Sequence, residues 1–244
     1  MSVRLSILLL AALPIISACG GAAEQDLADR GQAPLPSDIH PVTLSRLPPV
    51  TPEDLDDEGR RLLAESPNRR AGPGPGQFSQ YNPDSRDLGI PDGVGSPVGA
   101  RYFQLATMIT AREIDQEYEW SSHAVRGLVQ GVDQSVIDVV KYDRDVAGLS
   151  DKDATLITFG RTLLRENGVS SELWEQMVGH FGRQQTVQIL QIMAAYLRVG
   201  IMLNAVDQQV PELDDAWWAA RGCVSKCKEA AMADQVEILP PLDR

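Results

Sequence analysis

One short stretch of the sequence combines the residue types that proton transfer requires. Residues 117–123 read Glu-Tyr-Glu-Trp-Ser-Ser-His. Glu119 and His123 are four positions apart, so on a helix their side chains lie on one face and can touch. A carboxylate beside an imidazole can exchange a proton near neutral pH. The spacing predicts a general acid/base pair, and the alternative is a buried pair that only fixes one helix against the next.

Nearby aromatic and amide residues are candidates for contacts to a small ligand. We expect Trp120 to line a pocket and Tyr118 or Gln104 to supply hydrogen bonds. The acidic residues between positions 113 and 119 alternate along the chain, which is typical of a solvated face rather than a cation site. We therefore expect no metal and no organic cofactor. The other two histidines, His40 and His180, are weaker candidates for chemistry.

The charge of the chain excludes one class of partner. The sequence has 22 basic and 34 acidic residues, a net charge of −12. Removal of a leader that contains Arg4 would leave 21 basic residues against 34 acidic ones, or −13. Such a chain is repelled by nucleic acid and by anionic lipid. A nucleic-acid role is not expected, and membrane attachment would have to come from a lipid.

The first residues are typical of an export signal. A basic start is followed by the apolar run 5–16, which is too short for a mature membrane span. The run ends in small residues before Cys19, and this pattern resembles the lipobox of bacterial lipoproteins, in which that sulfur is lipidated. We expect residues 1–18 to be a lipoprotein signal peptide and residues 19–50 to be a flexible tether. The protein would then lie at the periplasmic face of the cell envelope, on the outer membrane, whereas an ordinary secretory signal is the alternative.

Two cysteines remain, Cys223 and Cys227, and in an exported protein they form an even pair. Their spacing does not match a redox C-x-x-C motif. Residues four apart on an ideal helix lie near the upper limit of disulfide geometry, so a bridge requires a turned backbone. We expect a local structural disulfide rather than a metal site or a redox pair.

The remaining pattern predicts an all-α protein. Apolar residues recur at helical spacing from residue 98 to about 210, and one helix from Thr51 to about residue 66 precedes them. A capping box at 110–113 is expected to restart a helix and to place Glu119 and His123 in its middle. Further helices are expected over 135–142, from Ser150 to Asn167, from Ser170 to Gly182 and over 184–206.

Two other regions have a distinct composition. The Pro/Gly-rich stretch 67–99 is interpreted as a covering loop, with a disordered connector as the alternative. Residues 51–210 would form the helical domain and 211–244 a C-terminal extension that carries two adjacent tryptophans.

The helix expected over 184–206 is apolar on nearly all sides, which predicts a central position or a shared subunit interface.

Four motifs in order resemble carboxymuconolactone decarboxylase family proteins. They are Glu117-Tyr-Glu-Trp-x-x-His123, Leu149-Ser-Asp-x-Asp-Ala154, Val169-Ser-x-x-x-Trp174 and Met202-Leu-Asn-Ala205. The resemblance covers about residues 50–207. It implies an alkylhydroperoxidase D-like helical bundle that assembles into homotrimers or hexamers through its long helices. The family includes the decarboxylase of aromatic-acid catabolism and the alkylhydroperoxidase D group.

The departures from this family are informative. The peroxidase branch has two cysteines at positions that correspond to Gln116 and Glu119, and its relay glutamate falls on Gln104. Without a thiol there is no nucleophile for peroxide reduction. The cysteine-free branch implies cofactor-free decarboxylation or isomerisation of a small carboxylate compound by His123 and Glu119. The alternative is a non-catalytic oligomeric binding or scaffold lipoprotein.

The lipid anchor gives a direct test. If Cys19 is the lipidated residue, Cys19→Ser releases the protein from the membrane fraction, because no basic surface remains to hold it there. Fractionation of cells that express each form would measure this release. A Cys19→Ser protein that still required detergent for extraction would contradict lipidation at Cys19.

Overall fold

A computed structural model describes residues 35–49, 51–65, 72–75, 98–219, 222–234 and 239–242. Across these ranges the chain forms helices, and the extended structure is limited to an isolated bridge between His40 and Ser45. The predicted all-α fold class is thereby confirmed. The elements are η1 (Pro52–Asp54), α2 (Asp57–Glu65), α5 (Ala100–Glu113), α6 (Glu117–Val129), α7 (Gln134–Lys141), α8 (Asp151–Glu166), α9 (Ser171–Ala205), α10 (Asp215–Ala219) and α11 (Ser225–Asp234).

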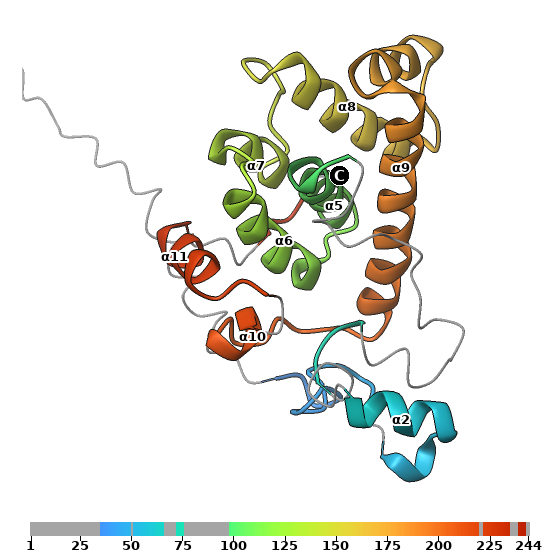
Figure 1. Ribbon diagram of the computed structural model, residues 1–244, viewed down its shortest axis with the longest axis vertical. Helices are drawn as coiled ribbons and strands as arrows, with labels where there is room; N and C mark the ends of the chain where they lie inside the picture. The colour runs from blue at the N-terminus through green and yellow to red at the C-terminus, as the bar shows by residue number, and fades with distance from the viewer. Residues whose placement is uncertain are drawn as a thin grey trace, which may run out of the picture. The chain divides into compact units, whose positions relative to one another are not determined.

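Helix α5 is the centre of the core. It packs against α6, α7, α8 and α9, which surround it in Figure 1. Every residue from Phe103 to Glu113 is buried, including polar ones, so this helix has no solvated face over most of its length. A helix enclosed in this way can bring a polar side chain such as Gln104 into the interior.

The predicted capping box at 110–113 is wrong. The Thr110 hydroxyl donates to the carbonyl of Ala106 at 2.9 Å, so it lies inside a continuous α5 and caps nothing. The break comes later, at residues 114–116, where Asp115 has a φ of 49°. Glu119 consequently lies in the first turn of α6 and not in the middle of a helix.

The chain ahead of the core also differs from expectation. The single helix predicted from Thr51 is observed as η1 followed by α2. Residues 35–49, which the sequence places in a flexible tether, pack instead on the end of α9. The Arg46 amide donates to the Val206 carbonyl at 2.9 Å, and Gln208 Nε2 donates to the Thr43 carbonyl at 3.1 Å. The signal peptide, Cys19 and the rest of the expected tether lie outside the described residues.

Part of the Pro/Gly-rich stretch 67–99 is held on the core through residues 72–75. Tyr118 Oη donates to the Pro73 carbonyl at 3.1 Å, and the Gly74 amide donates to Gln208 Oε1 at 3.0 Å. A Cβ on Gly74 would stand 1.9 Å from Tyr118 Oη, and its φ is +105°, so only glycine fits. These contacts agree with a covering segment, and residues 76–97 lie outside the described part of the chain.

Helix α9 joins the two helices expected over 170–206. Gly182 has the non-helical angles φ 71° and ψ 161°, so a kink separates these two helices within α9 at the predicted residue. Ile189, Met193 and Leu203 are buried, whereas the exposed fractions of Val187 and Ile201 are 46% and 56%. By length and composition alone this helix could cross a membrane, but the core helix of a soluble protein has the same properties.

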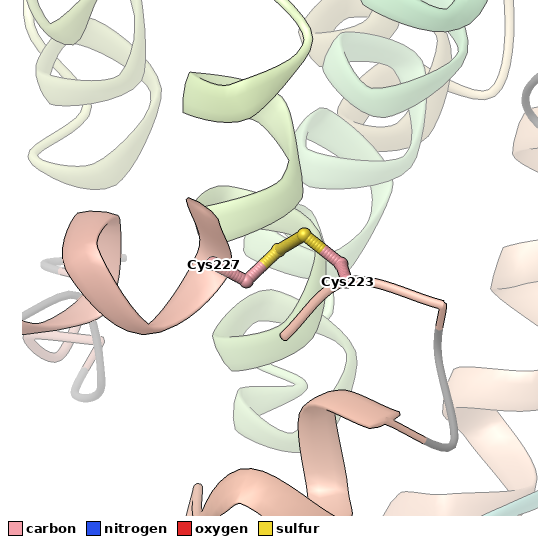
Figure 2. The surroundings of a disulfide bond; sticks show 2 residues. All are labelled: Cys223 and Cys227. Atoms are coloured by element: carbon pink, nitrogen blue, oxygen red, sulfur yellow. A yellow bond between two sulfur atoms is a disulfide. The ribbon is translucent and has the colours of Figure 1, made fainter. Parts of the chain in front are cut away.

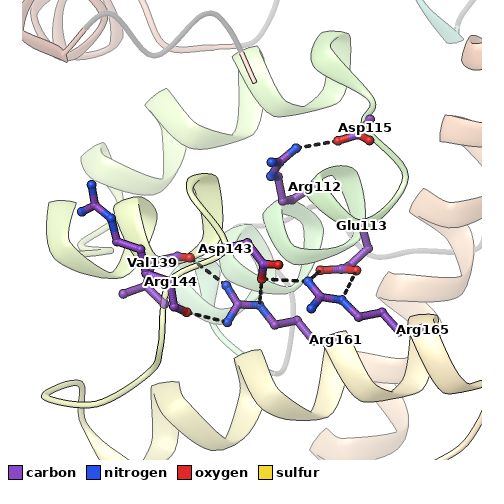
Figure 3. Close-up of polar contacts among 8 residues, drawn as sticks. All are labelled: Arg112, Glu113, Asp115, Val139, Asp143, Arg144, Arg161 and Arg165. Carbon is purple, nitrogen blue, oxygen red and sulfur yellow. Dashed lines mark hydrogen bonds and ion pairs between the residues drawn. The ribbon is translucent and has the colours of Figure 1, made fainter. Parts of the chain in front are cut away.

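A charged network ties α8 to the neighbouring elements (Figure 3). Arg165 donates to both carboxylate oxygens of Glu113 at 2.7 and 2.6 Å and to Asp143 at 2.8 Å. Arg161 pairs with Asp143 at 3.1 Å and donates to the carbonyls of Val139 and Arg144. Burial lowers the pKa of Arg161. Because its donors are used within the fold, the network is structural.

A second ion pair joins the start of α8 to α5. Arg101 donates to both carboxylate oxygens of Asp153 at 2.6 and 2.9 Å, and the Ser150 hydroxyl donates to the same carboxylate at 2.8 Å. Burial raises the pKa of Asp153, but these hydrogen bonds outweigh it, and the pKa lies below the ordinary value of 3.8. The ionised carboxylate therefore stabilises the fold.

Asp153→Asn should lower the free energy of unfolding by about 2 kcal/mol at neutral pH, because it leaves Arg101 without its carboxylate. The folded-state pKa is depressed, so the contribution is complete above the unfolded value of 3.8 and is lost as pH falls below it. Urea unfolding at pH 7 and pH 3 measures both effects. Asp133→Asn is the control, since Asp133 is 77% exposed and 3.9 Å from Arg101. An equal loss in both variants would contradict this role.

Candidate functional site

The side chain of Gln116 determines where α6 begins. Its Oε1 accepts from the amides of Tyr118 at 2.7 Å and Glu119 at 3.3 Å, which satisfies two of the free donors of the first turn. Its Nε2 donates to Asn204 Oδ1 on α9 at 2.8 Å, and Asn204 Nδ2 donates to the Ile114 carbonyl. The start of α6 is thus fixed to α5 and to the end of α9.

The predicted contact between Glu119 and His123 is present. Glu119 Oε2 lies 3.3 Å from His123 Nε2, one helical turn apart, and the two side chains are only 6% and 4% exposed. The other ring nitrogen, Nδ1, lies 2.7 Å from Gln104 Oε1 on α5. The imidazole is therefore held from both sides, by a carboxylate and by an amide.

The two ring nitrogens of His123 have different partners. With Gln104 Oε1 as the acceptor, Nδ1 is the donor. Nε2 faces the Glu119 carboxylate. A buried carboxylate–imidazole pair of this kind can give a proton to a bound ligand and take one from it.

The nitrogen of the Gln104 amide is a second polar atom of the site. Gln104 is fully buried, and its Nε2 has no hydrogen-bond partner among the described residues. A buried donor without an acceptor costs about 1–3 kcal/mol and requires a physical reason. A ligand oxygen beside His123 would satisfy this donor.

Aromatic rings complete the surroundings of His123. The ring of Tyr196 on α9 meets the imidazole edge-on with centroids 4.9 Å apart, and Phe103 on α5 lies 6.3 Å away. Phe103 is buried, whereas Tyr196 is only half-buried. Tyr196 is therefore the side chain of this group that reaches toward solvent.

The other two residues expected at the site have different surroundings. Trp120 is fully buried. Tyr118 contacts Pro73 through its hydroxyl and packs edge-on against Trp217 of α10, with centroids 5.2 Å apart. Tyr118 thus binds residues 72–75 and the C-terminal extension to α6. The structure brings Gln104 to the Glu119–His123 pair, but it gives Tyr118 a different set of partners.

The remaining candidate histidines and acidic residues lie apart from this site. His180 is exposed, and His40 Nδ1 accepts from the Val42 amide at 3.1 Å. Glu113 and Asp115 pair with Arg165 and Arg112. No group of three potential metal ligands occurs in the described ranges.

The cysteine pair lies in the C-terminal extension. Cys223 and Cys227 form a disulfide with their Cα atoms 5.6 Å apart (Figure 2). Cys227 lies in the first turn of α11, and Cys223 lies on the segment before it. Because one partner is outside the helix, the backbone turns between them as a bridge at this spacing requires.

Two clefts on the described surface are lined by residues other than Glu119, His123 and Gln104. One, of about 330 Å³, lies between the end of α6 and residues 222–226. Another, of about 280 Å³, lies beside Arg161 and Arg165. The Glu119–His123 pair is enclosed, since its side chains are only 6% and 4% exposed.

Sequence reasoning did not identify Tyr196 or Phe103 as neighbours of the site. Each is one apolar residue within a helical pattern, and only the packing of α5, α6 and α9 brings them to His123. Gln116 stands out in the sequence for its position in the family motif and not as a helix cap. Glutamine is not among the residues that usually cap helices, so no local signal points to that role.

Comparison with known proteins gives one informative match. The structure of the alkylhydroperoxidase core of an uncharacterised peroxidase-related protein from Ralstonia eutropha JMP134 is similar, with a TM-score of 0.55 and 19% identity. The match covers 71% of this chain and 94% of that one. No family model and no curated protein matches the sequence. At this identity the likeness shows the fold, which is an alkylhydroperoxidase D-like helical bundle.

Proposed function

We propose that this protein carries out cofactor-free proton transfer on a small carboxylate compound, as a carboxymuconolactone decarboxylase-like lyase or isomerase. His123 would be the general acid/base and Glu119 the group with which it exchanges a proton. The observation that carries the proposal is the unpaired Nε2 of Gln104, beside an imidazole that Glu119 also contacts. Decarboxylation and isomerisation both need a proton donor and a group that stabilises developing negative charge.

Each residue of the site would have a separate role in this reaction. Gln104 Nε2 donates to the substrate oxygen on which negative charge develops. Both ring nitrogens of His123 contact protein groups, so the substrate would take the place of Glu119 at Nε2, exchange a proton with His123 there, and leave Glu119 to stabilise the imidazolium by its charge. Phe103 and Tyr196 exclude water, which strengthens these interactions. Substrate can reach His123 only if a covering side chain moves, and the half-buried Tyr196 is placed to do so.

Peroxide reduction is not proposed. The positions that match the cysteines of the peroxidase branch hold a helix cap, Gln116, and the carboxylate of Glu119. Neither side chain is a redox nucleophile. The word "peroxidase-related" describes the similar protein from Ralstonia and is not carried over to this chain.

The location and assembly of the protein are also proposals. We infer attachment to the periplasmic face of the envelope through Cys19, as the lipobox pattern predicts. Assembly into a homotrimer or hexamer is supported by the outer face of α9. Val187, Ala194 and Ile201 recur every seven residues there, and all three are exposed. Such a repeat favours packing against the same helix of another copy.

A non-catalytic binding or scaffold lipoprotein is the second candidate. The enclosure of Glu119 and His123 favours it, because their side chains are only 6% and 4% exposed. A buried pair can serve only to fix α6 against α5. Substitution of the pair distinguishes the two candidates, because an enzyme would lose turnover and a scaffold protein would lose only stability.

Proton transfer can be tested without knowing the substrate. Small keto acids and lactone acids are incubated with the protein in deuterated water, and deuterium uptake is followed by mass spectrometry. We expect uptake with the parent chain and a loss of at least about 100-fold in His123→Gln and Glu119→Gln, because each removes a proton-transfer group. Light scattering and circular dichroism show whether each variant keeps its assembly and fold.

Glu119→Gln preserves the shape of the site, so it separates chemistry from folding even if His123→Gln unfolds. A folded Glu119→Gln protein with undiminished uptake would contradict the proposed role of the carboxylate. No uptake by the parent chain with any compound, together with unfolding of both variants, would favour the scaffold protein.

The proposed homo-oligomer can be tested by a substitution on the outer face of α9. Ile201→Glu should dissociate the oligomer, because a carboxylate on the outer face of α9 would be buried without a partner in the interface. Tyr142→Glu is the control, since Tyr142 is similarly exposed at 45% and lies just after α7. Light scattering measures the mass of each form. An Ile201→Glu protein with the parent's mass, or a monomeric parent, would contradict the proposed interface.

A further inference from the structure

The cleft of about 330 Å³ between α6 and the C-terminal extension has a chemistry that the proposed function does not use. Its walls are the end of α6 and the segment that carries the disulfide. They are formed by Arg126, Val129, Gln130, Gly222, Cys223, Val224, Ser225 and Lys226. One residue of the Cys223–Cys227 bridge, the half-buried Cys223, therefore forms part of the wall of the cleft.

Two cationic residues, Arg126 and Lys226, line this cleft. Neither of their side chains has an ion-pair or hydrogen-bond partner among the described residues. On a chain of net charge −12, two basic residues at one cleft make a local positive site on a negative protein. A small anion fits this site by charge.

The two sulfurs of the bridge differ in accessibility. Cys227 is fully buried against α6, whereas Cys223 is half-buried and lines the cleft. A thiolate entering the cleft can therefore attack only Cys223. The leaving sulfur, Cys227, lies in the first turn of α11, and the amide donors and dipole of a helix start stabilise a thiolate there.

We propose that this cleft binds a small carboxylate-bearing thiol and exchanges it with the Cys223–Cys227 disulfide. The thiolate of the ligand forms a bond to Cys223 Sγ, the Cys223–Cys227 bond breaks, and its electron pair leaves on Cys227 Sγ. A second thiolate then attacks the ligand sulfur of this mixed disulfide and releases Cys223 as a thiolate. In total, two ligand thiols are oxidised to one disulfide and the protein disulfide is reduced to two thiols.

This inference is independent of the proton-transfer site, because it involves neither Glu119, His123 nor Gln104. It replaces the expectation of an inert structural bridge, which followed from the C-x-x-x-C spacing alone. The spacing could not show that a cleft with two unpaired cations would lie beside Cys223.

The test compares thiols of different charge on the full-length chain carrying Cys19→Ser, so that the pair contains the only cysteines. Mercaptoacetate, 2-mercaptoethanol and 2-mercaptoethylamine are anionic, neutral and cationic thiols. Reduction is followed by alkylation and mass spectrometry, and each rate is divided by the thiolate concentration. We expect mercaptoacetate to react about fivefold or more faster than 2-mercaptoethanol, although the overall charge of the protein repels it.

The variants identify the cations responsible. Arg126→Gln/Lys226→Gln should abolish the preference for mercaptoacetate. Lys228→Gln should keep it, since Lys228 lies on the same helix but pairs with Asp215 at 2.9 Å and does not line the cleft. The mixed disulfide trapped by acid should be on Cys223. Equal rates for the three thiols, an unchanged preference in the double variant, or a bridge that is reduced only after unfolding would each overturn the proposal.

Discussion

The amide side chain of Gln116 lies where three helices meet, and it connects all of them. It accepts hydrogen bonds from the first turn of α6, follows directly on the end of α5, and donates to Asn204 on α9. The positions of Glu119 and His123 depend on where α6 begins and in which direction it runs. Without this side chain, two buried amides and the Asn204 carbonyl oxygen would lose their partners, and α6 would no longer be fixed against α9.

Close packing around this junction is what encloses the candidate site. A Cβ on Gly200 would stand 2.2 Å from Ile114 Cδ1, so the absence of a side chain there lets α9 approach the α5–α6 turn without displacing Ile114. That approach brings Tyr196 onto His123, while α5 supplies Gln104 from the other side. The result is a polar group of three side chains inside an otherwise apolar core. Their mutual contacts offset part of the cost of burial, whereas Gln104 Nε2 has no hydrogen-bond partner among the described residues.

Local chemistry predicted much of the fold from the sequence. Ser150 and Ser170 cap α8 and α9, and Asn167 ends α8 in a left-handed conformation, as their types indicate. The failures arise from tertiary structure. Thr110 lies on a helix that is buried on all sides, so its hydroxyl bonds back to α5 instead of starting a new helix. The contact between Glu119 and His123 follows from spacing alone, but those with Gln104 and Tyr196 require three helices to pack. The cations beside Cys223 likewise come from α6 and the distant extension.

The central claim is that His123 exchanges protons with a small carboxylate held beside Gln104. The most direct measurement is nitrogen NMR of the protein with ¹⁵N-labelled histidine, titrated with small keto and lactone acids at constant pH. The chain has three histidines, so His123→Gln identifies the relevant signals. For His123 we predict a protonated Nδ1 and an Nε2 resonance that shifts when a binding compound is added. The nitrogen resonances of His40 and His180 should not shift. Signals of His123 that remain unchanged with every compound would contradict it.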